Sequence, residues 1–143
     1  MKLPDVNLFL YAYDTHSPHH EPAKQWLEDA LSGTETVAFA WVALLGFVRL
    51  STSRHRLSSP WSVEQALDVV DSWLAQPVAT VVHPTPRHAS VLRDLLSPLG
   101  AGGNLTTDAH LAALAIEHGA TLCSSDVDFS RFAGLRWVDP IRA

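Results

Sequence analysis

Residues 107–128 read TDAHLAALAIEHGATLCSSDVD, which predicts a helix, a turn and a buried strand in immediate succession. Small and apolar side chains fill 107–118, and Gly119 ends the predicted helix because glycine accepts the left-handed backbone common at helix ends. The run at 120–124, ATLCS, has no charged side chain, as expected of a strand inside a parallel sheet. Acidic residues follow that strand at once. The stretch therefore predicts an α/β fold whose sheet ends in carboxylates.

Strand and helix patterns alternate through the rest of the chain. Short apolar or β-branched runs predict strands, and apolar positions at helical spacing predict amphipathic helices. This alternation predicts a three-layer α/β/α sandwich with a central parallel sheet, and no repeat or linker divides the single domain expected over 1–143. The predicted strands are 3–5, 36–40, 79–82, 120–124 and 135–138. The predicted helices lie near 8–13, 18–33, 41–51, 62–77, 86–99 and 107–118.

Composition limits the classes of function. Hydrophobic residues make up 47% of the 143 residues and charged residues 17%, with a mean hydropathy of +0.07. The net charge of −5 argues against a protein that holds nucleic acid by bulk positive charge. A lone cysteine, Cys123, rules out a disulfide framework and favours a reducing cytoplasm. The first residues, MKLPDVNLFLYAYD, resemble neither a signal peptide nor a membrane span.

Four aspartates fall where a parallel sheet places its ligands. Asp5 ends the first predicted strand, Asp126 and Asp128 follow the strand at 120–124, and Asp108 lies in the first turn of the helix before it. Each alone is explained as a cap or turn residue. Because ligands of open parallel sheets bind outside the carboxyl ends of the strands, however, all four are expected at one edge.

Converging carboxylates require a counter-charge, since they do not all ionise together in a cleft. Mg²⁺, or Mn²⁺ in its place, prefers oxygen ligands and leaves part of its shell to water and substrate phosphate. Such an ion lowers the pKa of a bound water and neutralises charge in a phosphoryl transition state. The residues thus predict metal-dependent hydrolysis of a phosphodiester.

In order, DVN at 5–7, TTDAHLAALAIEHGA at 106–120 and SSDVDFSRF at 124–132 resemble the PIN-domain nucleases. LLGFVRL at 44–50, PRH at 86–88 and FAGLRW at 132–137 are similar to one branch of VapC toxins from VapBC toxin–antitoxin pairs. The resemblance implies a Mg²⁺-dependent endoribonuclease that cleaves structured RNA such as transfer RNA, forms a homodimer and is inhibited by a VapB antitoxin. It maps the catalytic aspartates onto Asp5, Asp108 and Asp126, with Asp128 as a further metal ligand. It also implies accessory roles for Ser125 and Asn7.

One position departs from the broader PIN pattern. The family usually carries a glutamate near the start of the helix after the second strand, where this chain has Gly46. This departure leaves open whether one or two metal ions bind. It also leaves an alternative: a degenerate PIN domain that binds RNA or protein without cleavage.

Basic and imidazole side chains supply candidates for substrate contact. Arg49, Arg54 and Arg56 lie close together in the sequence, and arginine binds phosphate in a bidentate manner. His88 and His110 are placed where either could contact the substrate. An aspartyl-nucleophile phosphatase is disfavoured because its second aspartate, two residues after the first, is here Asn7. The chain contains no P-loop, dinucleotide fingerprint or nucleophile elbow.

Overall fold

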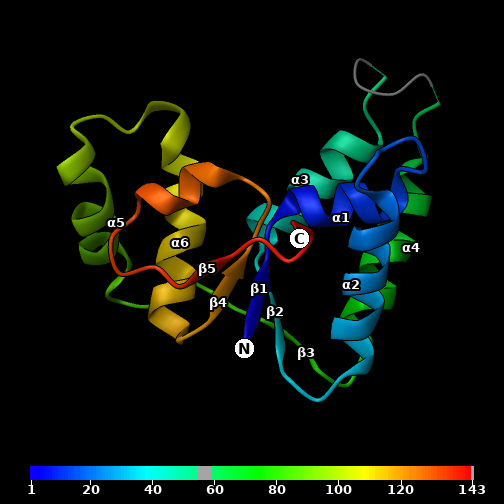
Figure 1. Ribbon diagram of the computed structural model, residues 1–143, viewed down its shortest axis with the longest axis horizontal. Helices are drawn as coiled ribbons and strands as arrows, with labels where there is room; N and C mark the ends of the chain where they lie inside the picture. Colours follow the sequence, from blue (N-terminus) through cyan, green and yellow to red (C-terminus); the bar gives the residue numbers. More distant parts are fainter. Residues whose placement is uncertain (55–58, 143) are drawn as a thin grey trace.

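Five short parallel strands form the centre of the computed structural model, which describes residues 1–54 and 59–142 (Figure 1). Their order across the sheet is β3-β2-β1-β4-β5, so the first strand of the chain lies in the middle. The predicted strands are confirmed, with boundaries that differ by one or two residues. They are β1 (Lys2–Pro4), β2 (Val37–Phe39), β3 (Ala79–Val81), β4 (Thr121–Cys123) and β5 (Trp137–Val138).

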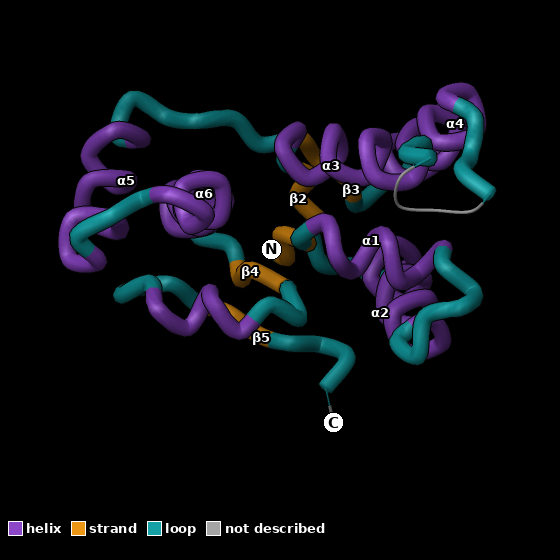
Figure 2. The backbone as a smooth tube through the Cα atoms, turned by 90° about the horizontal axis from the view of Figure 1, so that it is seen from above, coloured by secondary structure: helices purple, strands orange, loops and turns teal. Residues whose placement is uncertain are grey.

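Helices cover both faces of the sheet, which confirms the three-layer sandwich (Figures 1 and 2). One face packs against α1 (Val6–Tyr13), α2 (His20–Ser32), α3 (Trp41–Ser51) and α4 (Val63–Leu74). The other packs against α5 (His88–Leu96) and α6 (Thr106–His118). Three short 3-10 helices, η1 (Ser97–Leu99), η2 (Gly103–Leu105) and η3 (Val127–Arg131), complete the described elements.

The two cores differ in the size of their side chains. Under α1–α4, the ring of Trp73 stacks on Phe9 at a centroid distance of 4.4 Å and packs against Phe39 and Phe47. Under α6, small side chains of the helix itself form much of the core, together with Phe129 and Phe132. Four fully buried alanines of this helix, Ala109, Ala112, Ala113 and Ala115, allow it to approach the sheet closely. Close approach of α6 brings its first turn to the carboxyl edge of β1 and β4.

Local signals in the sequence account for several helix boundaries. Ser62 and Gln65 form a reciprocal capping box at the start of α4, as the sequence predicts for Ser62. Gly119 ends α6 with φ +66°, in the left-handed region. Asp5 caps α1 by accepting a hydrogen bond from the Val6 N–H. Within the part of the chain that the structure describes, every helix is too short to cross a lipid bilayer.

Candidate metal centre

The site begins where β1 and β4 end side by side. Pro4 pairs with Cys123 in the parallel register, and the Asp5 N–H donates to the Cys123 carbonyl at 2.9 Å. The residues that follow the two strands, Asp5 and Ser124, therefore face each other at the carboxyl edge of the sheet. Both are buried, with 8% and 0% of their surface exposed. Two segments more than a hundred residues apart in sequence thus meet at one point.

Ser124 is the centre of a hydrogen-bond network at this edge. Its hydroxyl donates to Asp5 Oδ2 at 2.8 Å and accepts from Asn7 Nδ2 and from the Asp126 N–H, both at 3.0 Å. Ser125 contributes its backbone N–H, which lies 3.4 Å from Asn7 Oδ1. The family resemblance points to Ser125, but the hydroxyl that holds Asp5 belongs to Ser124, which the sequence pattern does not single out.

Three further carboxylates gather beside this network. One oxygen each from Asp108, Asp126 and Asp128 lie within 4.8 Å of one another. Asp126 caps η3 by accepting from the Asp128 N–H at 2.9 Å, which orients both side chains. Asp108 comes from a different element, the first turn of α6. Asp5 lies next to this group of three, with its two oxygens held by Val6 and Ser124.

Burial and mutual repulsion raise the proton affinities of two of the carboxylates, Asp108 and Asp5. Burial, together with the charges of Asp5, Asp126 and Asp128, raises the pKa of Asp108 to about 6. Burial also raises the pKa of Asp5, and it outweighs the opposing hydrogen bonds from Ser124 and Val6. Electrostatic coupling of Asp108 to all three others indicates that the cluster has an uncompensated negative charge.

A hard divalent cation fits this donor set. The three gathered side chains offer only carboxylate oxygens, which Mg²⁺ and Mn²⁺ prefer, and Asp108 and Asp126 are only half-buried. Two positive charges would offset the repulsion that raises the pKa of Asp108. The described residues therefore provide Asp108, Asp126 and Asp128 as candidate ligands, with Asp5 adjacent.

Metal affinity is expected to fall in acid because Asp108 must lose its proton to bind a cation. With a pKa of about 6, its carboxyl is ionised at pH 7.5 and mostly protonated at pH 5. The apparent dissociation constant for Mn²⁺ should therefore be about tenfold higher at pH 5 than at pH 7.5, since affinity follows the ionised fraction. Isothermal titration of metal-free protein with Mn²⁺ at the two pH values measures this ratio. Equal affinities would contradict the role of Asp108 as a ligand.

The two serines after β4 provide a matched pair of variants. Ser124→Ala removes the hydroxyl that Asp5 and Asp126 share, so we expect a loss of about 1–3 kcal/mol in the free energy of unfolding, the cost of unpaired buried polar groups. Metal affinity should fall about tenfold, as for other residues that orient ligands. Ser125→Ala leaves the backbone N–H in place and should change neither quantity. Denaturant unfolding and Mn²⁺ titration compare the pair, and equal effects would rule out the special role of Ser124.

Gly46 lies against the start of α1. A Cβ placed on Gly46 would be 3.2 Å from Val6 Cγ2, a distance tighter than ordinary van der Waals contact. Val6 directly follows Asp5, so the glycine permits α3 to pack closely beside the residue that leads into the site. A neighbouring helix therefore accounts for the absence of a side chain at this position.

The arginines named from the sequence lie on and after α3. Arg49 is exposed in the last turn of α3, and Arg54 is exposed a few residues later. Arg56 lies outside the described residues. Among the described residues no hydrogen bond or ion pair engages the side chain of Arg49 or Arg54, so both side chains remain candidates for substrate contact.

Comparisons with known proteins agree with this geometry. The PIN domain family model matches residues 2–135. Ribonuclease VapC37 of Mycobacterium tuberculosis is 51% identical over 140 residues, which cover 98% of this chain and 97% of the relative. Ribonuclease VapC33 of the same organism is 42% identical over 142 residues, 99% of each chain.

Solved structures share the fold at low sequence identity. VapBC2 from Rickettsia felis, bound to a DNA fragment from its promoter, superposes with a TM-score of 0.68 at 21% identity over 96% of both chains. VapBC-1 from nontypeable Haemophilus influenzae gives a TM-score of 0.67 at 17% identity, over 99% of this chain and 98% of the other. With the family match and the identity to VapC relatives along nearly its whole length, the chain belongs to the PIN domain family, in its VapC branch.

Proposed function

We propose that this protein is a Mg²⁺-dependent endoribonuclease and the toxin of a VapBC pair. The observation that carries the proposal is the group formed by Asp108, Asp126 and Asp128 beside the buried Asp5. Its relatives bear the name ribonuclease, and the sheet edge where the carboxylates lie is where α/β proteins bind ligands. We extend the proposal to structured RNA such as transfer RNA as the substrate, and to Mn²⁺ as a substitute ion.

The side chains would divide the work of hydrolysis. When bound, the cation supplies a more acidic water and positive charge beside the scissile phosphate. Asp108, Asp126 and Asp128 would hold it, while Asp5 would accept a proton or orient a water from its buried place. Ser124 fixes the Asp5 carboxylate, and Asn7 fixes Ser124. This arrangement leaves room for one ion held by the three gathered carboxylates, with Gly46 in place of a further acidic ligand.

Cleavage by the purified chain tests the proposal. Mg²⁺ should support cutting of transfer RNA, EDTA should stop it, and the products should carry a 5′-phosphate and a 3′-hydroxyl, because water is the nucleophile. Cyclic 2′,3′-phosphate ends, or cleavage that survives EDTA, would overturn the mechanism. RNA binding with no cleavage under any divalent ion would favour the degenerate PIN domain instead.

The partner is proposed to be a VapB-type antitoxin. The neighbouring structures are VapBC complexes, and an apolar groove of about 480 Å³ between α1, α2 and α4 offers a place for a partner side chain. Trp73 lines this groove, and its buried Nε1–H is the one buried side-chain donor of the described residues that has no acceptor. A homodimer is proposed from composition and family, and light scattering at micromolar concentration would test it.

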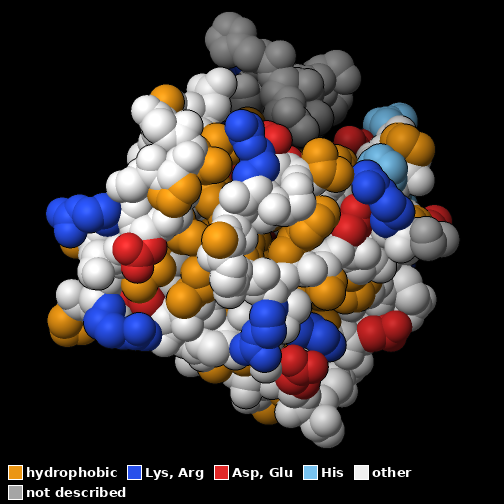
Figure 3. All heavy atoms as spheres, turned by 60° about the vertical axis from the view of Figure 1, so that its left-hand side comes forward, with side chains coloured by type: hydrophobic (Ala, Val, Ile, Leu, Met, Phe, Trp, Pro, Cys, Tyr) orange, Lys and Arg blue, Asp and Glu red, His pale blue; other side chains and the backbone are white. Residues whose placement is uncertain are grey.

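The route of the RNA is proposed to pass Arg49 and Arg54. On the face shown in Figure 3, Lys and Arg side chains are scattered and most lie beside Asp or Glu, so bulk charge gives little attraction there. We therefore propose that phosphate contacts depend on individual arginines rather than on a basic patch.

A further inference from the structure

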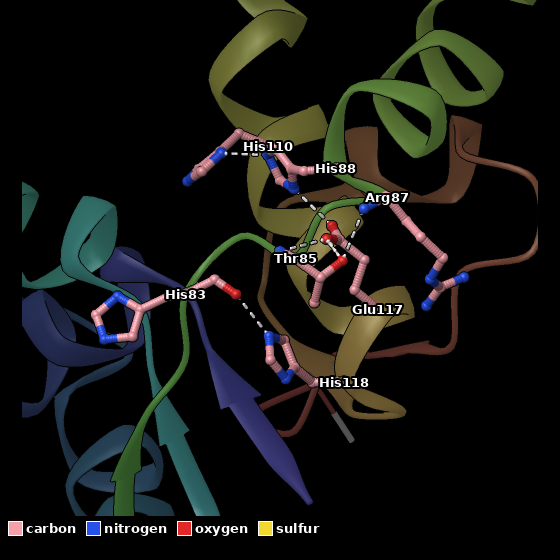
Figure 4. Close-up of polar contacts among 7 residues, drawn as sticks. All are labelled: His83, Thr85, Arg87, His88, His110, Glu117 and His118. Atoms are coloured by element: carbon pink, nitrogen blue, oxygen red, sulfur yellow. Dashed lines mark hydrogen bonds and ion pairs between the residues drawn. The ribbon is translucent and has the colours of Figure 1, made fainter.

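A second polar cluster lies between α5 and α6, built around a carboxylate with no exposed side-chain surface (Figure 4). Glu117 Oε1 accepts from the Thr85 N–H at 2.9 Å and from the Thr85 hydroxyl at 2.6 Å. Its Oε2 lies 2.5 Å from His88 Nδ1, and His88 Nε2 lies 2.8 Å from His110 Nδ1. A continuous chain of hydrogen bonds therefore runs from the loop before α5 through Glu117 and His88 to His110.

The buried end of the chain determines the direction of every hydrogen bond in it. Burial opposes the charge of Glu117, but the bonds from Thr85 and His88 outweigh burial and lower the pKa of this carboxyl. An ionised carboxylate only accepts, so His88 Nδ1 must donate. A neutral imidazole has one donor and one acceptor nitrogen. With both rings neutral, His88 Nε2 accepts from His110 Nδ1–H, and His110 Nε2 is left as an acceptor.

That acceptor is at the outer end of the chain. Figure 4 shows the second ring nitrogen of His110 directed away from His88 and α5. His110 is only partly buried, and among residues 1–54 and 59–142 no group bonds to its Nε2. A tie between α5 and α6 would need only Glu117 and His88. A role in holding α5 against α6 therefore does not explain why the ring of His110 takes part in the chain of hydrogen bonds.

His110 lies on the same helix as Asp108 but does not belong to the group of carboxylates. It follows Asp108 by two residues in the first turns of α6, and two residues on a helix point to nearly opposite flanks. A helix with its side chains is about 10–12 Å across. The nucleotide that concerns His110 is therefore one beside the scissile phosphate, not the one held at the carboxylates. A phosphate has no hydrogen to donate, which makes it a poor partner for an acceptor nitrogen.

We propose that His110 Nε2 accepts a hydrogen bond from a ribose 2′-hydroxyl next to the cleavage site, which makes it a determinant of RNA specificity. His88 and Glu117 are positioning residues that set the tautomer of His110. The 2′-hydroxyl is the donor that distinguishes RNA from DNA. This inference rests on the proposed ribonuclease function. Because water is the nucleophile there, the 2′-hydroxyl is not consumed and can serve recognition alone.

Chimeric substrates test the contact. An RNA oligonucleotide that the wild type cleaves receives single 2′-deoxy substitutions at each of the three nucleotides on either side of the cut. At one of these positions the substitution should slow cleavage by the wild type about three- to tenfold, as expected for the loss of one neutral hydrogen bond. His110→Leu should cut the all-RNA substrate at that reduced rate. The same 2′-deoxy substitution should not slow this variant further. His110→Gln, whose Oε1 can take the place of Nε2, should remain sensitive to it.

Outcomes of this scan are separable. If every variant shows the same deoxy profile as the wild type, His110 does not read the ribose and the inference is overturned. The inference is also overturned if His110→Leu changes the effect of a base substitution on the cleavage rate but changes the effect of no 2′-deoxy substitution. If the wild type cuts no RNA at all, the proposed function fails instead.

Glu117→Gln tests the positioning role. The glutamine oxygen can still accept from Thr85, which turns its NH₂ group toward His88 Nδ1 and reverses both rings, so that His110 Nε2 becomes a donor. Long-range ¹H–¹⁵N spectra of the neutral rings should show Nδ1–H on both histidines in the wild type and Nε2–H on both in the variant. The variant should also lose the ribose sensitivity while its Mn²⁺ affinity is unchanged. A wild-type protein with Nε2–H on His110 would overturn the assignment.

Discussion

Asp108→Asn is expected to abolish RNA cleavage while it makes the metal-free protein more stable. The amide keeps the shape of the side chain but removes the charge that helps to hold the cation. Loss of a residue that merely orients a metal ligand already costs about 10–100-fold, so loss of a ligand should cost about 100-fold or more. Burial and the charges of Asp5, Asp126 and Asp128 together raise the pKa of Asp108 to about 6. Stability should rise because the neutral amide avoids both the burial of a charge and the repulsion.

The sign of the stability change follows from proton linkage. In the folded metal-free protein Asp108 takes up its proton near pH 6, whereas its unperturbed value is 3.8. Its raised pKa therefore lowers the free energy of unfolding above pH 6, and this penalty fades as the pH falls toward 4. The melting temperature of the variant should exceed that of the wild type at pH 7.5, and the difference should shrink at pH 4.5.

Asp94→Asn is the matched control for this experiment. Asp94 is exposed on α5, so the variant carries the same chemical change away from the four carboxylates. We expect it to cut RNA at the wild-type rate and to melt at nearly the wild-type temperature. An Asp108→Asn protein that cuts at the wild-type rate would remove Asp108 from the site.

Gly46→Glu is expected to reduce cleavage about 100-fold, the cost that a misplacement of about 1 Å can already cause in an active site. Its Cβ would be 3.2 Å from Val6 Cγ2, and valine is stiff at χ1 in a helix, so Val6 has little freedom to turn aside. Displacement of Val6 moves Asp5, whose carboxylate is bonded to the Val6 N–H. Single-turnover cleavage and Mn²⁺ titration would measure the effect.

Neighbouring positions separate crowding from charge. Leu45→Glu places the same residue one position earlier in α3, where the leucine is 60% exposed, and should leave the rate nearly unchanged. Gly46→Ala should cause a smaller loss than glutamate, and Val6→Ala should reverse that loss by making room. If Gly46→Glu has an unchanged rate and metal requirement, Gly46 is remote from the site. Tighter Mn²⁺ binding would instead show that the new carboxylate reaches the ion.

Elements with a strong local pattern are predictable from the sequence. The helix expected at 41–51 is α3 to the residue, because a strand pattern precedes it and a polar loop follows it. Ser62 is recognised as a cap from its hydroxyl and from the apolar spacing that follows. The four aspartates are predictable as a set, because their positions after strands or in a first helical turn follow from element order alone.

Contacts that depend on register are not predictable in this way. β4 is buried on both faces, so alternation of its side chains does not reveal which serine meets Asp5. Only the pairing of Pro4 with Cys123 places Ser124 there. The link from Glu117 to His88 joins residues 29 apart, and it depends on how α5 packs on α6. Local periodicity carries no information about either.

The central place of β1 has a consequence for biosynthesis. Asp5 is among the first residues made, but its buried partner Ser124 follows 119 residues later. At a synthesis rate of about 5–20 residues per second, this separation corresponds to roughly 6–24 s of translation. During that interval β1, β2 and β3 can emerge from the ribosome, but β4, the second neighbour of β1 in the sheet, has not yet been made. A nascent chain therefore has no assembled carboxylate centre until its last fifth has left the ribosome, which would leave time for the proposed antitoxin to bind the N-terminal helices first.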